Sequence, residues 1–147
     1  MEAENRGINE ELFEVICSAW DSQPCHQSMG IKVTYLGKGI AGLTMTPTPN
    51  FSTGGGRIHG GIIATMIDVA MGAAAATLGR VYRTAELKLN YIAPAFETEL
   101  LVVEGRIIHP GKTLAVIEAT LLNGEGKLLA KGMGTFFGDN KIPPPEV

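Results

Sequence analysis

A single carboxylate lies within a long apolar stretch near the middle of the chain. The segment HGGIIATMIDVAMGAAAATLGR, residues 59–80, contains only Asp68 as an ionisable residue between its two ends. A carboxylate is expensive to bury unless it is hydrogen-bonded or paired. Burial also tends to raise the pKa of an acid, which suits it to act as a base. Asp68 is therefore the first candidate for a catalytic group.

The start of the same segment is suited to holding a carbonyl oxygen. The first N–H groups of a helix have no partner within it, and the helix dipole is positive at that end. Glycine allows a ligand to approach the backbone closely because it has no Cβ. Gly60 and Gly61, directly after His59, are thus candidate donors to a developing oxyanion.

The spacing of the two candidates constrains how they can work together. Gly60 and Asp68 are eight residues apart, which is about 12 Å along a helix axis. Reacting atoms must come within about 3–3.5 Å of each other. If both residues act on one carbonyl group, they must come from two copies of the chain. Two antiparallel helices across a twofold axis would then form two sites per dimer.

The surrounding sequence predicts the elements that position this helix. Hydrophobic periodicity indicates an α+β protein with an antiparallel sheet of five or six strands wrapped around a long central apolar helix, plus a short N-terminal helix. The Pro- and Gly-rich segment 47–57 reads as a loop, and the last three strands should form a meander. The predicted helices span 9–20 and 60–78, and the predicted strands span 31–36, 40–46, 84–95, 99–108, 113–123 and 127–137.

Composition narrows the class of protein further. The 147 residues suit one domain, and the net charge of −3 gives no reason to expect a nucleic-acid or membrane partner. The acidic N-terminus does not resemble a signal peptide. Without a Cys-x-x-Cys or His/Cys cluster, Cys17 and Cys25 are expected to be reduced thiols in a cytoplasmic protein with no metal. His26 and His109 are expected in loops.

These motifs together resemble a known family. His-Gly-Gly, an Asp at the ninth position from the His, and Tyr-x-x-Pro at 91–94 are similar to the hotdog-fold acyl-CoA thioesterases of the phenylacetate-degradation type. TAELKLNYIAPA and GKTLAVIEATLLNGEGKLLAKGMGTF also look like strands of that family. The resemblance implies an N-terminal helical segment over 1–27, a hotdog thioesterase domain over 28–138 and a loose tail over 139–147.

The resemblance also implies an activity and its residues. A short- or medium-chain or aromatic acyl-CoA would be hydrolysed to the free acid and CoA, without a cofactor, by a dimer or a dimer of dimers. The Gly60 N–H would polarise the thioester carbonyl, and Asp68 would act as general base or nucleophile. His59 and Thr84 occupy the two other positions implied to be catalytic.

One position departs from the family pattern. Members often carry an Asn six residues before the His, but Thr53 stands there and the nearest Asn is Asn50. Either the glycine run at 54–56 forms a bulge that still brings Asn50 to the substrate, or the Asn role is lost. Phe51 is a candidate for the acyl pocket, and Gly61 for substrate binding.

Basic residues at the ends of elements could bind the phosphates of CoA, since Arg and Lys suit phosphate recognition. The candidates are Arg57, Arg83 and Lys112. Surface charges more often simply interact with water, so the alternative is that these three side chains bind no ligand.

Structural alternatives exist for the other candidates too. Asp68 could be a buried structural acid that is hydrogen-bonded to Thr65 or Thr84. His59 could stabilise the loop, and Gly60 and Gly61 could simply allow tight packing at the start of the helix. The alternative functions are a non-catalytic acyl-CoA-binding hotdog protein and a hotdog dehydratase or hydratase.

Overall fold

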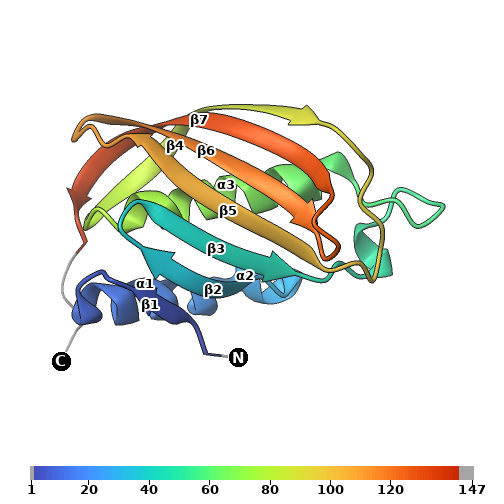
Figure 1. The fold of residues 1–147 in the computed structure, drawn as a ribbon, viewed down its shortest axis with the longest axis horizontal. Helices are drawn as coiled ribbons and strands as arrows, with labels where there is room; N and C mark the ends of the chain where they lie inside the picture. Colours follow the sequence, from blue (N-terminus) through green and yellow to red (C-terminus); the bar gives the residue numbers. More distant parts are fainter. Residues whose placement is uncertain (1, 143–147) are drawn as a thin grey trace.

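The computed structural model describes residues 2–142 as one curved sheet with a long helix on its concave face (Figure 1). The strands follow the order β1-β2-β3-β5-β6-β7-β4, and all neighbours are antiparallel except β1 and β2. The elements are β1 (Glu4–Arg6), α1 (Glu10–Ser22), α2 (Pro24–Met29), β2 (Lys32–Gly37), β3 (Ile40–Met45), η1 (Pro49–Phe51), α3 (Gly60–Ala76), β4 (Arg80–Tyr91), β5 (Leu101–His109), β6 (Leu114–Asn123) and β7 (Leu128–Lys141).

The predicted α+β architecture is confirmed, including the apolar central helix and the β5-β6-β7 meander. The sheet has seven strands where five or six were expected, because residues 4–6 add β1 beside β2. This strand is polar and has no apolar alternation that sequence could reveal. Arg6 places its guanidinium over the ring of Tyr35, 3.7 Å from the centroid, which helps to hold β1 in place.

Near both ends of the described part, residues 2–142, the chain forms more secondary structure than the sequence indicated. Part of the predicted N-terminal segment pairs into the sheet as β1, and the expected break after α1 contains a second short helix, α2. Pro24 begins α2 and Gly30 ends it in a left-handed conformation, as such residues commonly do. At the other end, β7 continues to Lys141, so 139–141 of the predicted loose tail are strand; residues 143–147 lie outside the described part.

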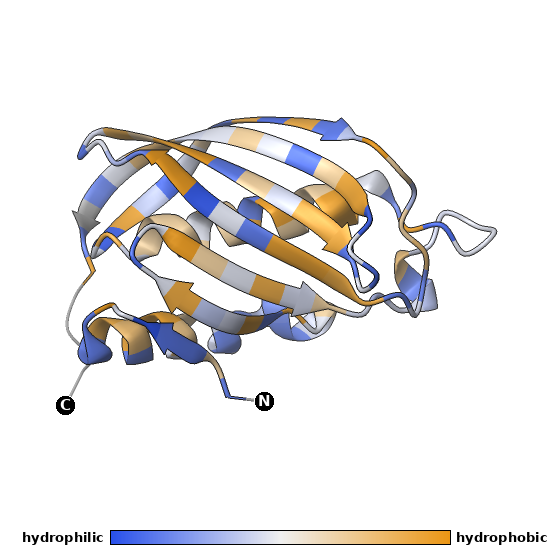
Figure 2. Cartoon of the chain, viewed as in Figure 1, coloured by the Kyte–Doolittle hydropathy of each residue, from blue (hydrophilic) through white to orange (hydrophobic). Residues whose placement is uncertain are grey.

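The sheet alternates between apolar and polar residues along most strands (Figure 2). On β6, for example, every second residue from Ala115 to Asn123 is buried. The buried side chains meet those of α3, where Met66, Ile67, Ala70 and Met71 are fully buried. This pattern places the main core between α3 and the concave face of the sheet.

The helix lies directly on the backbone of β5. A Cβ added at Gly105 would stand 2.3 Å from the carbonyl oxygen of Ala70 on α3. No side chain can therefore be accommodated at Gly105 unless the helix moves.

The N-terminal helix α1 covers a further part of α3 and the end of the sheet (Figure 1). The Asn9 side chain caps its start by accepting a hydrogen bond from the Leu12 N–H at 3.1 Å. Ile16 is buried, and Trp20 packs against the core from the last turns of the helix. Within residues 2–142, every helix is too short or too polar to cross a membrane.

Strand β4 forms one edge of the sheet. Its only sheet neighbour among the described residues is β7, and most of its twelve residues are exposed. A long edge strand presents unpaired N–H and C=O groups that can pair with another chain.

Replacing Gly105 with Ala should lower the free energy of unfolding by about 3 kcal/mol, because the new methyl group forces α3 away from β5. Urea denaturation of the two proteins measures the difference. Gly124→Ala is the matched control, since its Cβ would meet only Leu100, at 3.4 Å, and its effect should stay within about 0.5 kcal/mol. Equal stability of Gly105→Ala and wild type would contradict the contact.

Candidate active site

His59 caps the N-terminus of α3. Its Nδ1 accepts a hydrogen bond from the Gly61 N–H at 2.8 Å, with the His59 backbone at φ −59° and ψ 135°. This contact satisfies one of the free N–H groups at the helix start. His59 therefore has a structural role at the start of the helix. The Gly61 N–H already donates to this side chain.

The Gly60 N–H remains available. Within the described residues it donates to no other group, and it is the first N–H of α3. The Tyr91 hydroxyl, from β4, donates to the Gly60 carbonyl oxygen at 2.9 Å. A Cβ on Gly60 would lie 3.2 Å from the Tyr91 ring, so glycine permits the close approach of this tyrosine. The helix start is therefore fixed by His59 on one side and Tyr91 on the other.

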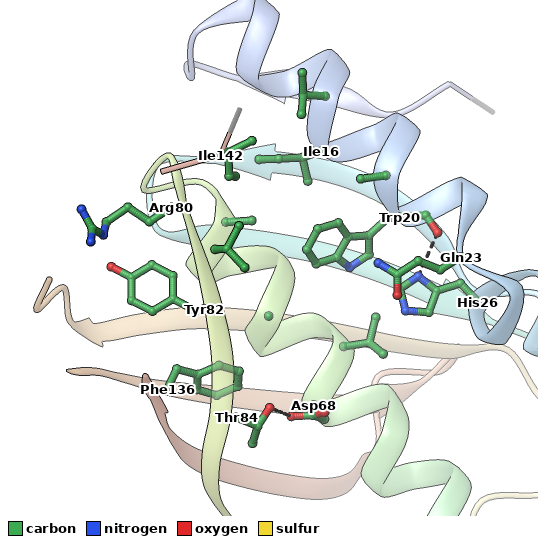
Figure 3. A pocket seen from close by; sticks show the side chains of 16 residues that line it. Ile16, Trp20, Gln23, His26, Asp68, Arg80, Tyr82, Thr84, Phe136 and Ile142 are labelled. Atoms are coloured by element: carbon green, nitrogen blue, oxygen red, sulfur yellow. Dashed lines mark hydrogen bonds between the residues drawn. The ribbon is translucent and has the colours of Figure 1, made fainter. Parts of the chain in front are cut away.

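Asp68 is held by Thr84. The Thr84 hydroxyl donates to Asp68 Oδ1 at 2.6 Å, from strand β4 to helix α3 (Figure 3). Thr65, the other partner considered, instead donates to the Gly61 carbonyl oxygen at 2.9 Å. Asp68 is half-buried. Its second oxygen, Oδ2, has no hydrogen-bond partner among residues 2–142, which leaves it free to take a proton or attack a carbonyl carbon.

A cavity of about 510 Å³ opens beside Asp68 and Thr84 (Figure 3). It lies between α1, α3 and the first half of β4, and its walls are mostly apolar. Its size falls within the range of about 300–1,000 Å³ that is usual for small-molecule sites. The lining includes Ile16, Trp20, Val69, Gly72, Val81 and Phe136.

The loop before α3 is closed on itself. Thr53 donates to the Arg57 carbonyl oxygen through both its N–H, at 2.8 Å, and its hydroxyl, at 3.3 Å. Glycines 54–56 all have positive φ and form the tip between them. Asn50 is exposed on η1, and Phe51 packs partly against the core while its carbonyl accepts from the His59 N–H. Thr53 thus closes the loop, and a role of Thr53 or Asn50 toward a substrate stays a prediction.

The predicted basic residues are dispersed. The loop that carries Arg57 lies at one end of the sheet, whereas the β5–β6 turn that carries Lys112 lies at the other (Figure 1). Arg83 contacts the Asp139 carboxylate at 3.4 Å from an exposed position on β4. The three do not form one cluster within a single chain.

Other reactive groups are accounted for. Burial, reinforced by the charge of Asp21, raises the pKa of Cys17 to about 11, so this thiol is protonated at neutral pH and is a poor nucleophile. His26 was expected in a loop but is buried on α2, where its Nδ1–H donates to the Trp20 carbonyl at 2.8 Å. No group of three His, Cys, Asp or Glu residues that could hold a metal occurs in residues 2–142.

Two features of the site were missed in the sequence. Tyr91 was noted only as part of Tyr-x-x-Pro, although it supports the helix start from the far end of β4. Trp20 was placed only at the end of the predicted helix over 9–20, although it lines the cavity beside Asp68. Both contacts join elements distant in the chain, so no local spacing could reveal them.

Comparison with known proteins identifies the family of the chain. The family model described as "Thioesterase superfamily" matches residues 55–130, just over half of the chain. A relative from Saccharolobus solfataricus, whose name classes it provisionally as an esterase, is 34% identical over 111 residues, covering 74% of this chain and 79% of the relative. The acyl-coenzyme A thioesterase PaaI of Escherichia coli is 24% identical over 111 residues, covering 76% and 79%.

Solved structures show the same fold. The E. coli PaaI structure superposes with a TM-score of 0.84 at 21% identity, covering 94% of this chain and 98% of that one. A Streptococcus mutans protein bound to acetyl CoA gives a TM-score of 0.74 at 26% identity, covering 77% and 91%. The chain therefore belongs to the thioesterase superfamily and is a hotdog-fold enzyme of the thioesterase class.

Proposed function

We propose that this protein hydrolyses the thioester bond of an acyl-CoA and releases the free acid and CoA. The observation that carries the proposal is Asp68, held by Thr84 at the edge of an apolar cavity, with one carboxylate oxygen free. The CoA part of the proposal is supported by two similar proteins, one named an acyl-coenzyme A thioesterase and the other bound to acetyl CoA.

The proposed reaction uses Asp68 as general base or as nucleophile. As a base, Asp68 takes a proton from water while the water oxygen bonds to the carbonyl carbon. The Gly60 N–H stabilises the oxyanion that forms. The C–S bond then breaks, and the proton passes from Asp68 to the CoA sulfur. As a nucleophile, Asp68 would bond to the carbonyl carbon, and the C–S bond would break with release of the CoA thiolate; water would then cleave the resulting mixed anhydride to the free acid and restore the Asp68 carboxylate.

The two groups belong to different subunits in this proposal. Gly60 and Asp68 lie eight residues apart on the same helix, about 12 Å along its axis. A homodimer that brings the α3 helices side by side and antiparallel would place the Gly60 of one subunit near the Asp68 of the other. The long edge of β4 supports such an assembly, because its unpaired backbone groups can bond to a second subunit. The same strand carries Thr84 and Tyr91, which contact Asp68 and Gly60.

We further propose that the enzyme is cytoplasmic and needs no cofactor. Cys17 and Cys25 are free thiols, as the reducing cytoplasm favours. We assign no catalytic step to His59 beyond holding the helix start. Arg57, Arg83 and Lys112 remain candidates for the CoA phosphates, with residues of two subunits contributing to one CoA site.

Asp68→Asn should reduce hydrolysis by about 100-fold or more, because the amide can keep the Thr84 bond but cannot accept a proton or attack. Release of free thiol measures turnover across acyl-CoAs from acetyl to palmitoyl, with phenylacetyl and benzoyl included. Circular dichroism and thermal melting confirm that the variant folds.

Unchanged turnover in Asp68→Asn would contradict the catalytic role. If wild type binds acyl-CoA but releases no thiol from any of them, the protein is a binding protein and the proposal fails. Hydration of an enoyl-CoA without thiol release would instead identify a hydratase.

Thr84→Val should lower kcat/KM by about 10-fold, because loss of the hydroxyl frees Asp68 to leave its position. Thr84→Ser keeps the hydroxyl and should retain most of the activity. The measurement is the full pH profile of kcat/KM for all three proteins. Equal values for the Val and Ser variants would mean that the bond has no part in positioning Asp68.

Gly60→Pro should reduce kcat by about 100-fold, because proline lacks the N–H that would face the oxyanion. Proline is well tolerated at the first position of a helix, and the ψ of 135° at His59 is compatible with a following proline. Gly60→Ala is the control, since it adds a Cβ against Tyr91 but keeps the N–H. It should lose much less activity than Gly60→Pro.

Combining the two defects tests the shared site. A heterodimer of Gly60→Pro and Asp68→Asn chains, purified through two different tags, would contain one intact site and one doubly defective site. It should recover about half of the wild-type activity. A heterodimer as inactive as its parents would place both groups in the same chain and overturn the two-subunit site.

A further inference from the structure

A glycine in the interior of α3 lies one turn from Asp68. Gly72 follows Asp68 by four residues, so both lie on the same face of the helix. Glycine in a helix interior is less favourable than alanine by about 1 kcal/mol. The position therefore calls for a reason.

Packing within the chain does not require glycine there. A Cβ on Gly72 would meet a single atom within 4 Å, the Trp20 Cζ2, at an ordinary contact distance of 3.8 Å. The contrast with Gly105 is clear, since a Cβ there would stand 2.3 Å from backbone. The backbone of Gly72 is also ordinary α-helix, which any residue adopts. A side chain at Gly72 would therefore fill open space without straining the backbone.

That space belongs to the cavity beside Asp68. Gly72 lines it from α3. The Trp20 ring lines it from α1 (Figure 3) and lies within van der Waals reach of a Cβ on Gly72. Along α3 the lining runs from Asp68 to Ala76, about 12 Å by helix rise. The wall formed by Ile16 and Trp20 closes the cavity on the α1 side.

The same cavity carries unsatisfied donors in its walls. Among the residues the structure describes, two buried side-chain nitrogens have no hydrogen-bond partner, Trp20 Nε1 and Arg80 Nε. Both side chains line this cavity. Neither nitrogen is accessible from the cavity, so the surface that a ligand would meet there is mainly apolar.

We propose that Gly72 and Trp20 determine acyl specificity: the acyl group lies in this cavity beside Gly72, and the Trp20 indole forms the wall that limits its size. The inference rests on the proposed function, because the thioester carbonyl must lie at Asp68. The cavity volume and its reach along α3 fit a medium-length chain or a single ring. An extended long fatty acyl chain exceeds the reach of about 12 Å along α3.

The single tryptophan of the chain gives a direct test of acyl binding. In the Asp68→Asn protein, octanoyl-CoA and phenylacetyl-CoA should change the Trp20 emission, whereas free CoA should bind with much less change. Isothermal titration calorimetry on the same samples measures binding independently of the indole. Binding of both acyl-CoAs without any change in emission, or no binding of either, would overturn the assignment.

Substitution tests the specificity. Gly72→Ala should melt at or above the wild-type temperature, because alanine favours the helix and its Cβ fits. Its kcat/KM for octanoyl-CoA and phenylacetyl-CoA, or its affinity for them in the Asp68→Asn background, should fall by about 10-fold. Acetyl-CoA should be nearly unaffected. Trp20→Leu should shift the preference toward longer chains, and Gly124→Ala is the control remote from the cavity.

The outcomes separate the inference from the proposed function. Identical acyl preference in wild type, Gly72→Ala and Trp20→Leu would overturn the inference and leave hydrolysis intact. Loss of the dimer in Gly72→Ala, measured by sedimentation, would assign the glycine to subunit contact and also overturn it. Acyl-dependent emission without hydrolysis by wild type would refute the proposed function while the acyl cavity stands.

Discussion

The direct contact between the backbones of α3 and β5 sets the geometry of the whole molecule. At Gly105 a Cβ would stand only 2.3 Å from the Ala70 carbonyl oxygen, so the helix can lie at this height above the sheet only because the residue is glycine. That height brings Asp68 within hydrogen-bond reach of Thr84 and the start of α3 within reach of Tyr91. Core packing and the arrangement of the reactive groups therefore follow from the same close approach.

Strand β4 supports α3 at two points, its start and its middle. Thr84, near its start, bonds Asp68, and Tyr91, at its end, bonds Gly60. The start and the middle of the helix thus each carry one half of the proposed chemistry, supported by the same edge strand. Helix α1 completes the cavity beside Asp68. In the proposed function, this N-terminal segment therefore contacts the acyl group. The N-terminal helix is then part of the substrate site as well as a cover for the core.

The sequence was sufficient for the main architecture because its signals are local. Periodicity located α3 and the meander, and the lone carboxylate among apolar residues drew attention to Asp68. Strand β1 was missed because a three-residue polar strand has no pattern of its own and depends on Tyr35 and the edge of β2. The bond of Tyr91 to Gly60 and the position of Trp20 beside Asp68 were equally invisible, since each depends on how distant elements pack.

The eight-residue separation of Gly60 and Asp68 has an evolutionary consequence in the proposed dimer. Each chain would carry two half-sites, one at the helix start and one in its middle. After a gene duplication, one copy could lose its aspartate and the other its glycine, and their pairing would still contain one complete centre. The vacated centre would then be free to acquire a regulatory or a second substrate-binding role. This geometry therefore gives the fold a simple route from a symmetric enzyme to a heteromeric one.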